Sequence, residues 1–170
     1  LLLMGGYFLF VGESINVYMD GENVTSHTTI SPFAGVNTDE LNKEICTYTF
    51  SAMNNTTADA NSLKQGILRI CLAHGLDNVK VKLDSSLGEN KIPVLYHVQG
   101  KSMYPTLNDG QTVIVEKTKN VKVGNMVVAN SSEYGVIIKR VSQIKGDEIY
   151  LTSDNTNVES EYRNGVLYET

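Results

Sequence analysis

The chain has 170 residues, of which 41% are hydrophobic, a formal net charge of −5 and a pI near 5.2. This length and composition suit one full hydrophobic core with a small additional module. The acidic balance argues against a nucleic-acid-binding protein, which usually presents a basic face. We therefore expect a folded protein that has no nucleic-acid partner.

The first eleven residues, 1–11, are uncharged and apolar. A membrane-spanning helix takes about 20 residues, so we interpret residues 1–12 as the trailing part of a membrane anchor. A buried N-terminal strand or helix is the alternative, because apolar runs of this length often form one. The anchor interpretation predicts attachment of the protein to a membrane.

Residues 13–90 have the pattern of a small α+β module. In its two predicted helices the apolar residues recur at helical intervals, and in its second strand apolar and polar residues alternate. Asp59 or Asn61 caps the second helix, and Gly75 ends it. No motif in the module indicates its role. The predicted elements are strands at residues 15–19 and 79–83 and helices at residues 39–50 and 62–74.

The two cysteines, Cys46 and Cys71, fall one on each predicted helix. They either form a disulfide in an exported domain or remain buried thiols that pack as small hydrophobic residues. The histidines His27, His74 and His97 have neither metal-ligand spacing nor a triad arrangement, and His97 is interpreted as a structural residue. No metal and no other cofactor is therefore expected.

Residues 91–170 are predicted to form a compact antiparallel β domain. Short turns rich in Gly, Asn and Asp separate the strand candidates. These connections are too short to contain the crossover segments that parallel strands need. The strand candidates are residues 94–98, 112–115, 126–129, 136–141 and 148–151.

A small hydroxyl residue, Ser102, follows the strand predicted at residues 94–98. Gly100 precedes it and Pro105 follows it, and this combination restricts the backbone of the loop. A fixed backbone is what a nucleophilic serine needs if its own N–H is to face the oxyanion that forms. An ordinary turn serine is the alternative interpretation of this position taken alone.

The strand predicted at residues 136–141 places Lys139 among aliphatic residues, 37 positions after Ser102. An outward-facing lysine on a half-buried strand would give the same pattern. Burial by neighbours such as Ile138 and Val141 would instead lower the lysine pKa, by up to roughly 3–5 units for a fully buried group. A neutral amine accepts a proton from a serine hydroxyl. The two positions together therefore indicate a Ser–Lys catalytic dyad.

Five sequence blocks resemble, in the same order, those of the Ser–Lys peptidase superfamily, which contains the type I signal peptidases and the self-cleaving LexA-like repressors. The resemblance covers residues 93–155, a little over a third of the chain. The blocks are GKSMYPTL at residues 100–107, VKVGN at 121–125, IIKRV at 137–141, GD at 146–147 and SDN at 153–155.

The resemblance implies a mainly β catalytic domain with Ser102 as nucleophile and Lys139 as general base. It implies that the substrate is a protein or peptide bound as an extended strand beside the Ser102 strand, with small side chains near the scissile bond. Met103 is expected to help shape the substrate pocket. The residues expected to support the site, to shape the pocket or to serve the oxyanion are Gly100, Met103, Pro105, Arg140, Ser153, Asp154 and Asn155.

With the apolar N-terminal segment, the resemblance implies a membrane-anchored, signal-peptidase-like serine endopeptidase on the extracytoplasmic side that cleaves exported precursors. A self-cleaving repressor-like domain is one alternative. It needs an internal scissile bond, for which Ala34 and Gly35 have the composition, but no helix-turn-helix pattern accompanies them. A non-catalytic exported binding module on the same scaffold is the other alternative, and the intact Ser102 and Lys139 argue against it.

The chain departs from the signal peptidase pattern at several positions. Lys139 stands where many archaeal and eukaryotic enzymes carry histidine, and Gly100 stands where bacterial enzymes often place a hydroxyl residue that helps the oxyanion hole. The separation of 37 positions between Ser102 and Lys139 is shorter than in the bacterial enzymes and resembles the repressor branch. After Asn155 the likeness is loose, and Ser160 is suggested there as a partner for the lysine.

Overall fold

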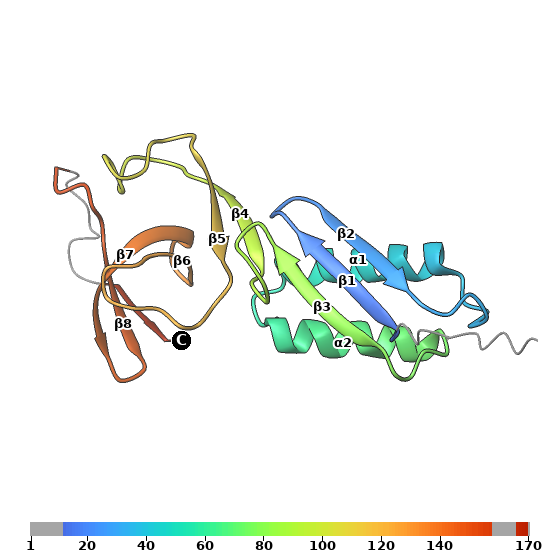
Figure 1. The fold of residues 1–170 in the computed structure, drawn as a ribbon. Helices are drawn as coiled ribbons and strands as arrows, with labels where there is room; N and C mark the ends of the chain where they lie inside the picture. Colours follow the sequence, from blue (N-terminus) through green and yellow to red (C-terminus); the bar gives the residue numbers. More distant parts are fainter. Residues whose placement is uncertain (1–11, 158–165, 170) are drawn as a thin grey trace, which may run out of the picture. The chain divides into compact units, whose positions relative to one another are not determined.

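The computed structural model describes residues 12–157 and 166–169. These residues contain two helices and nine strands, which confirms the predicted mainly β fold with a small helical part (Figure 1). The chain divides into two compact units between Pro93 and Val94, here called unit 1 and unit 2. Each unit is described by itself.

Unit 1 is a three-stranded sheet with both helices against one face (Figure 1). The central strand β1 (Ser14–Met19) is antiparallel to β2 (Val24–Thr29) and parallel to β3 (Lys80–Ser85). A parallel pair needs a long crossover connection. The helices α1 (Thr38–Asn54) and α2 (Ala60–Ala73) provide it.

The core of unit 1 lies between its sheet and its two helices. Buried and exposed residues alternate along β1, so that one face of the strand packs against the helices. Burial of one such aliphatic side chain contributes roughly 1.5–3 kcal/mol through its removal from water. The side chains of this core that are 0% exposed are Ile15, Met19, Leu41, Ile45, Thr49, Leu63, Ile67 and Cys71.

The second helix begins at a reciprocal cap, and this decides between the two predicted capping residues. The Asp59 carboxylate accepts a hydrogen bond from the N–H of Ser62 at 2.7 Å, and the Ser62 hydroxyl accepts one from the N–H of Asp59 at 2.9 Å. Asp59 rather than Asn61 is therefore the cap. Gly75 follows the end of α2 with φ of +84°, as expected for a helix stop.

The strand β2 is not predicted by the sequence pattern. Its sequence, VTSHTT, contains a single aliphatic residue and gives no apolar alternation. Side-chain hydrogen bonds hold this strand in place instead. The Asp20 carboxylate closes the preceding turn by accepting a hydrogen bond from the N–H of Asn23 at 2.7 Å. The hydroxyls of Ser26 and Thr28 then donate to Asn42 of α1, at 2.9 and 2.7 Å. Polar contacts to the helix thus take the role that apolar alternation has in β1.

Cys46 and Cys71 are free thiols in the structure, so the disulfide does not form, and the buried-thiol alternative holds for Cys71. Cys71 is buried and Cys46 is half-buried. Burial raises the pKa of both thiols. Because the thiolate is the reactive form, neither cysteine has the character of a nucleophile.

The two helices come close at Gly66, where the Tyr48 ring lies against the glycine. A Cβ added at Gly66 would overlap the hydroxyl end of the Tyr48 ring. We expect Gly66→Ala to lower the free energy of unfolding by about 1 kcal/mol, because overpacking costs roughly 1–3 kcal/mol and better helix propensity returns about 1 kcal/mol. Urea unfolding measures the change. In a protein that already carries Tyr48→Ala, Gly66→Ala should stabilise the fold. If Gly66→Ala lowered the free energy of unfolding equally in both backgrounds, overlap with Tyr48 would not be the cause.

Unit 2 contains a two-stranded sheet, β4–β5, and a four-stranded sheet in the order β6-β7-β8-β9. All neighbours in the four-stranded sheet are antiparallel. The five strands expected in this part of the chain are present, and β9 adds to them. The strands are β4 (Pro93–His97), β5 (Thr112–Glu116), β6 (Met126–Ser131), β7 (Gly135–Lys145), β8 (Glu148–Thr152) and β9 (Val166–Glu169).

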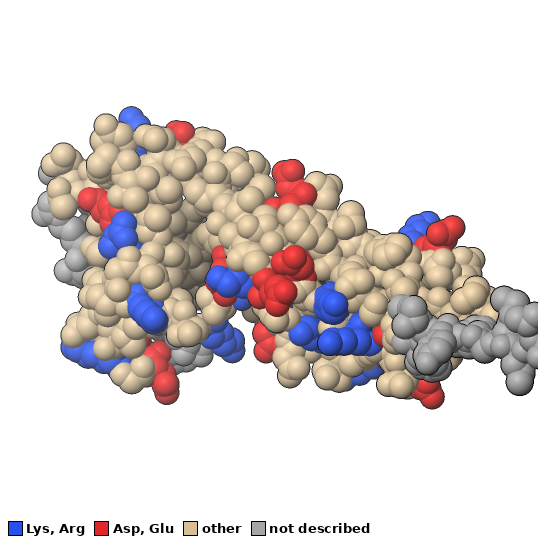
Figure 2. All heavy atoms as spheres, viewed as in Figure 1, with Lys and Arg blue, Asp and Glu red and all other residues tan. Residues whose placement is uncertain are grey.

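Two expectations fall outside the part of the chain that the structure describes: the anchor at residues 1–12, of which only Gly12 is described, and Ser160. Within the described ranges, no helix has both the length and the apolar character to cross a bilayer. On the face shown in Figure 2, Lys and Arg side chains lie beside Asp and Glu side chains.

Candidate active site

Ser102 lies in the loop that joins β4 to β5, and hydrogen bonds within the loop fix its base. The N–H of Gly110 donates to the carbonyl of Val98 at 2.9 Å, and the N–H of Gly100 donates to the Asp109 carboxylate at 2.8 Å. Gly100 has φ of +84°, a conformation in which any residue with a Cβ is strained. Glycine therefore suits this position in the loop.

A small apolar cluster of Val98, Met103 and Leu107 lies beneath this loop, and Ile138 of β7 packs against it. Met103 is only 2% exposed, so the residue directly after Ser102 is anchored inside the unit. Ser102 itself is half-buried. The serine is therefore held at the surface by a buried neighbour. The expected role of Met103 in a substrate pocket stays a prediction.

Lys139 lies on β7 opposite Val127 of β6 and is 6% exposed. Together with Val141 it forms the two buried positions of the strand. Burial lowers the pKa of Lys139 below that of an ordinary lysine, because the ammonium is poorly solvated there. A lowered pKa is one property that a lysine general base needs, and the catalytic role of Lys139 stays a prediction.

Asp154, which follows β8, joins β7 to the Ser102 loop. Its carboxylate accepts hydrogen bonds from Arg140 Nε at 2.7 Å and Nη2 at 2.6 Å, a bidentate ion pair. The same carboxylate accepts a bond from the Thr106 hydroxyl at 2.6 Å. Arg140 is the neighbour of Lys139, and Thr106 lies four residues after Ser102. Three of the sequence blocks therefore meet at this carboxylate.

Asn155 binds the backbone on both sides of the candidate nucleophile. Its backbone N–H donates to the carbonyl of Ser102 at 2.9 Å, and its Nδ2 donates to the carbonyl of Lys101 at 2.9 Å. The sequence pattern indicates Asn155 as part of a supporting motif but does not indicate its partner. Lys101 and Thr106 were not singled out, since nothing in a local pattern marks a partner about 50 positions away.

Ser153 is the remaining residue of the late motif. Its hydroxyl is buried and, within the described residues, has no hydrogen-bond partner. It directly follows Thr152, which pairs with Arg140 across β7 and β8. Pro105 is exposed in the Ser102 loop. Supporting roles for Ser153 and Pro105 stay predictions.

The Asp154 ion pair carries a stability prediction. Hydrogen bonds from Arg140, and then from Thr106, hold the pKa of Asp154 below its ordinary value of 3.8. A carboxyl whose folded-state pKa is lowered stabilises the fold above its unfolded-state pKa and loses that contribution as the pH falls. We expect Asp154→Asn to lower Tm at pH 7 by on the order of 5 °C. The difference from wild type should shrink toward pH 3 in thermal unfolding, and an equal difference at both pH values would contradict the ion-pair explanation.

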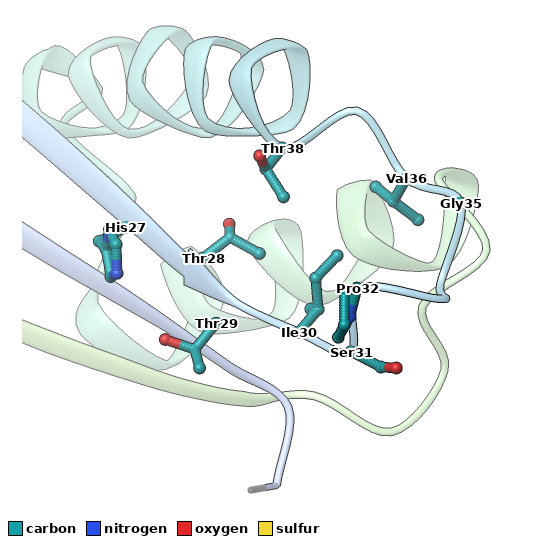
Figure 3. Close-up of a pocket in the computed structure, with 9 residues that line it drawn as sticks. All are labelled: His27, Thr28, Thr29, Ile30, Ser31, Pro32, Gly35, Val36 and Thr38. Carbon is teal, nitrogen blue, oxygen red and sulfur yellow. The ribbon is translucent and has the colours of Figure 1, made fainter.

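His97 and a hollow in the surface of unit 1 lie outside the Ser102 loop and are not assigned to the candidate site. His97 Nδ1 is hydrogen-bonded to the Thr112 hydroxyl at 2.9 Å, which links β4 to β5. The hollow, of about 440 Å³, lies between the end of β2 and the start of α1 (Figure 3). Thr28, Pro32 and Val36 are among its lining residues. No group of His, Cys, Asp and Glu in the described residues is arranged to hold a metal ion.

A mainly β unit with a serine loop, a buried lysine and an acidic late motif is typical of a serine-type peptidase. Comparison with family models agrees: the model described as Peptidase S24-like matches residues 66–166. The chain belongs to the Peptidase S24-like family. The resemblance found in the sequence is thereby confirmed.

Two kinds of curated relative are similar to part of the chain. Signal peptidase IB of Staphylococcus aureus (strain Mu50 / ATCC 700699) is 35% identical over 77 residues, which are 43% of this chain and 35% of the relative. The LexA repressor of Pelagibacter ubique (strain HTCC1062) is 34% identical over 82 residues, which are 48% of this chain and 36% of the relative. The chain thus spans about a third of the length of these relatives. No solved structure matches the chain.

Proposed function

We propose that the protein is a serine endopeptidase that cleaves exported precursor proteins, with Ser102 as nucleophile and Lys139 as general base. The observation that carries the proposal is the buried Lys139 on a strand whose next residue, Arg140, is tied through Asp154 to the Ser102 loop. Ile138, on the other side of Lys139, packs against the cluster that contains Met103.

The proposed reaction has two halves. Neutral Lys139 accepts the proton of the Ser102 hydroxyl while the oxygen attacks the carbonyl carbon of the scissile peptide bond. The tetrahedral intermediate collapses as Lys139 gives that proton to the leaving amine, and an acyl-enzyme remains on Ser102. A water molecule then attacks the acyl carbon, Lys139 takes the proton of the water, and the proton passes to the departing Ser102 oxygen.

Stabilisation of the oxyanion is assigned to backbone N–H groups, because Gly100 has no side chain to contribute. The main donor in this proposal is the backbone N–H of Ser102, which would donate a hydrogen bond to the oxyanion. In other serine enzymes the loss of one such donor costs about 3–4 kcal/mol of transition-state stabilisation. The direction in which the Ser102 N–H points is therefore a determinant of the proposed activity.

The signal-peptidase-like role is supported by the curated signal peptidase relative and by the apolar residues 1–11. We propose accordingly that the protein is membrane-anchored, that its catalytic part is extracytoplasmic, and that its substrates bind as extended strands. Self-cleavage is the second candidate function. It is favoured by the LexA repressor relative and by the exposed loop around Ala34 and Gly35, where the neighbouring Phe33 is 87% exposed.

One experiment separates these functions. The full chain and its Ser102→Ala and Lys139→Ala variants are incubated in detergent with a panel of exported precursor peptides across pH 6–10, and the mass of the protein is followed in parallel. Precursor cleavage that disappears in both variants supports the endopeptidase. A wild-type chain that cuts only itself between Ala34 and Gly35 supports the repressor-like function. A folded wild-type chain that cuts nothing would favour the non-catalytic binding module.

A further inference from the structure

We propose that Asn155 is a positioning residue of the active site, which aims the N–H of Ser102 at the oxyanion. This inference rests on the proposed function and adds a residue to it. Asn155 acts through the backbone of the Ser102 loop, and it is therefore not itself assigned a catalytic step.

One peptide unit links Asn155 to the Ser102 N–H. The carbonyl of Lys101 and the N–H of Ser102 belong to the same peptide unit, which is trans. In a planar trans unit the C=O and the N–H point in opposite directions. The 2.9 Å hydrogen bond from Asn155 Nδ2 to the Lys101 carbonyl thus fixes the direction of the Ser102 N–H as well.

Asn155 also holds the other side of the nucleophile. The backbone N–H of Asn155 donates to the carbonyl of Ser102 at 2.9 Å, so the peptide unit after Ser102 is held by the same residue. With both flanking peptide units held, the backbone dihedrals of Ser102 are restrained. Among the described residues, none accepts a hydrogen bond from the N–H of Ser102. Within the described part of the chain the Ser102 N–H thus has a fixed direction and no acceptor, and oxyanion stabilisation requires a preorganised donor of this kind.

Asn155 is itself held in place. Its Oδ1 accepts a hydrogen bond from the N–H of Asn157 at 3.0 Å, which orients the side-chain amide with its Nδ2 toward Lys101. The preceding residue, Asp154, is fixed by its ion pair with Arg140. An amide side chain fits this position because it donates to one partner and accepts from another.

The test uses a substitution that removes only the donor. Asn155→Asp keeps the acceptor for Asn157 and the backbone bond to Ser102, but a carboxylate cannot donate to the Lys101 carbonyl. Asn155→Ala removes both side-chain bonds without adding charge. Asn108→Asp is the matched control, since it adds the same charge to an exposed position of the Ser102 loop. Circular dichroism checks folding, and Asn155→Asp decides the outcome if Asn155→Ala does not fold.

Two measurements report on the oxyanion. For a precursor peptide cleaved by the wild type, both Asn155 variants should lower kcat by about 10- to 100-fold, with KM changed less than about two-fold. A peptide boronic acid with alanine next to the boron forms a tetrahedral adduct with a serine oxygen, and its inhibition constant should rise by a similar factor. The midpoint of the pH profile should be unchanged in Asn155→Ala, since Lys139 is untouched. Asn108→Asp should behave as wild type.

The outcomes distinguish the two proposals. Asn155 variants with wild-type kcat and wild-type boronate affinity, or with a change in KM alone, overturn the positioning role while the endopeptidase stands. A wild-type protein that neither cleaves the peptide nor binds the boronate overturns the proposed function and the positioning role with it.

Discussion

Replacement of Ser102 by alanine is expected to lower peptidase activity by about four to six orders of magnitude, because removal of the nucleophile forces a direct attack by water. The substitution deletes one oxygen and leaves the backbone contacts of Asn155 to the loop in place. The fold should therefore be retained. Single-turnover cleavage of a precursor peptide, followed by mass spectrometry, measures the loss.

Ser132→Ala is the matched control for this variant, since Ser132 is an exposed serine of unit 2 outside the sequence blocks. It should cleave at the wild-type rate. Residual cleavage by Ser102→Ala within about ten-fold of wild type would show that another group is the nucleophile, and the assigned role of Ser102 would then be wrong.

Replacement of Lys139 by methionine is expected to lower activity by about three to five orders of magnitude, because general-base catalysis and the nucleophile act as a unit. Methionine fills the buried position with an apolar chain and removes only the amine. Lys117→Met is the matched control, since burial also lowers the pKa of Lys117 and this residue lies outside the sequence blocks. The control should retain activity.

The wild-type pH profile provides the second part of this prediction. Only the neutral amine accepts a proton, so activity should rise with pH along one limb whose midpoint lies below 10.5, the ordinary lysine pKa. The Lys117→Met variant should keep that limb. A midpoint at the ordinary lysine value, or an unchanged limb in Lys139→Met, would contradict the role of Lys139.

The free energy of unfolding should also depend on the protonation of Lys139. A buried lysine with a lowered folded-state pKa binds fewer protons in the folded state than in the unfolded state. Wild-type stability is therefore reduced below the folded-state pKa, and it rises as the pH increases through the window between the folded and unfolded pKa values. Lys139→Met lacks this dependence, so its stability relative to wild type should be greatest at the lower pH.

Much of the fold could be predicted because it rests on local signals. The alternation in β1 and β3 and the helical spacing in α1 and α2 are direct consequences of burying one face of each element. The strand β2 lacked that signal because hydroxyl contacts to Asn42 replace apolar burial. Such contacts depend on the tertiary fold and leave no periodic pattern in the sequence.

The residue types of the candidate site could be predicted from the sequence. The hydrogen bonds that join these residues could not. The aliphatic neighbours of Lys139 predicted its burial, and the structure has it buried. The bond from Thr106 to Asp154 and that from Asn155 to Lys101 span 48 and 54 positions. Neither residue propensities nor the spacing of motifs identifies partners that are so far apart in the sequence. The resemblance named a supporting motif, and only the three-dimensional arrangement assigns its partners.

Covalent labelling of Ser102 gives a direct test of the Ser–Lys dyad. The full chain is treated with a serine-reactive phosphonate across pH 6–10, and the adduct is counted by intact mass and located by peptide mapping. A Ser–Lys dyad predicts one adduct, on Ser102, formed at a rate that rises with pH in the wild type and is lost in Lys139→Met. An adduct on another residue, or labelling of Lys139→Met at the wild-type rate, would contradict the Ser–Lys dyad.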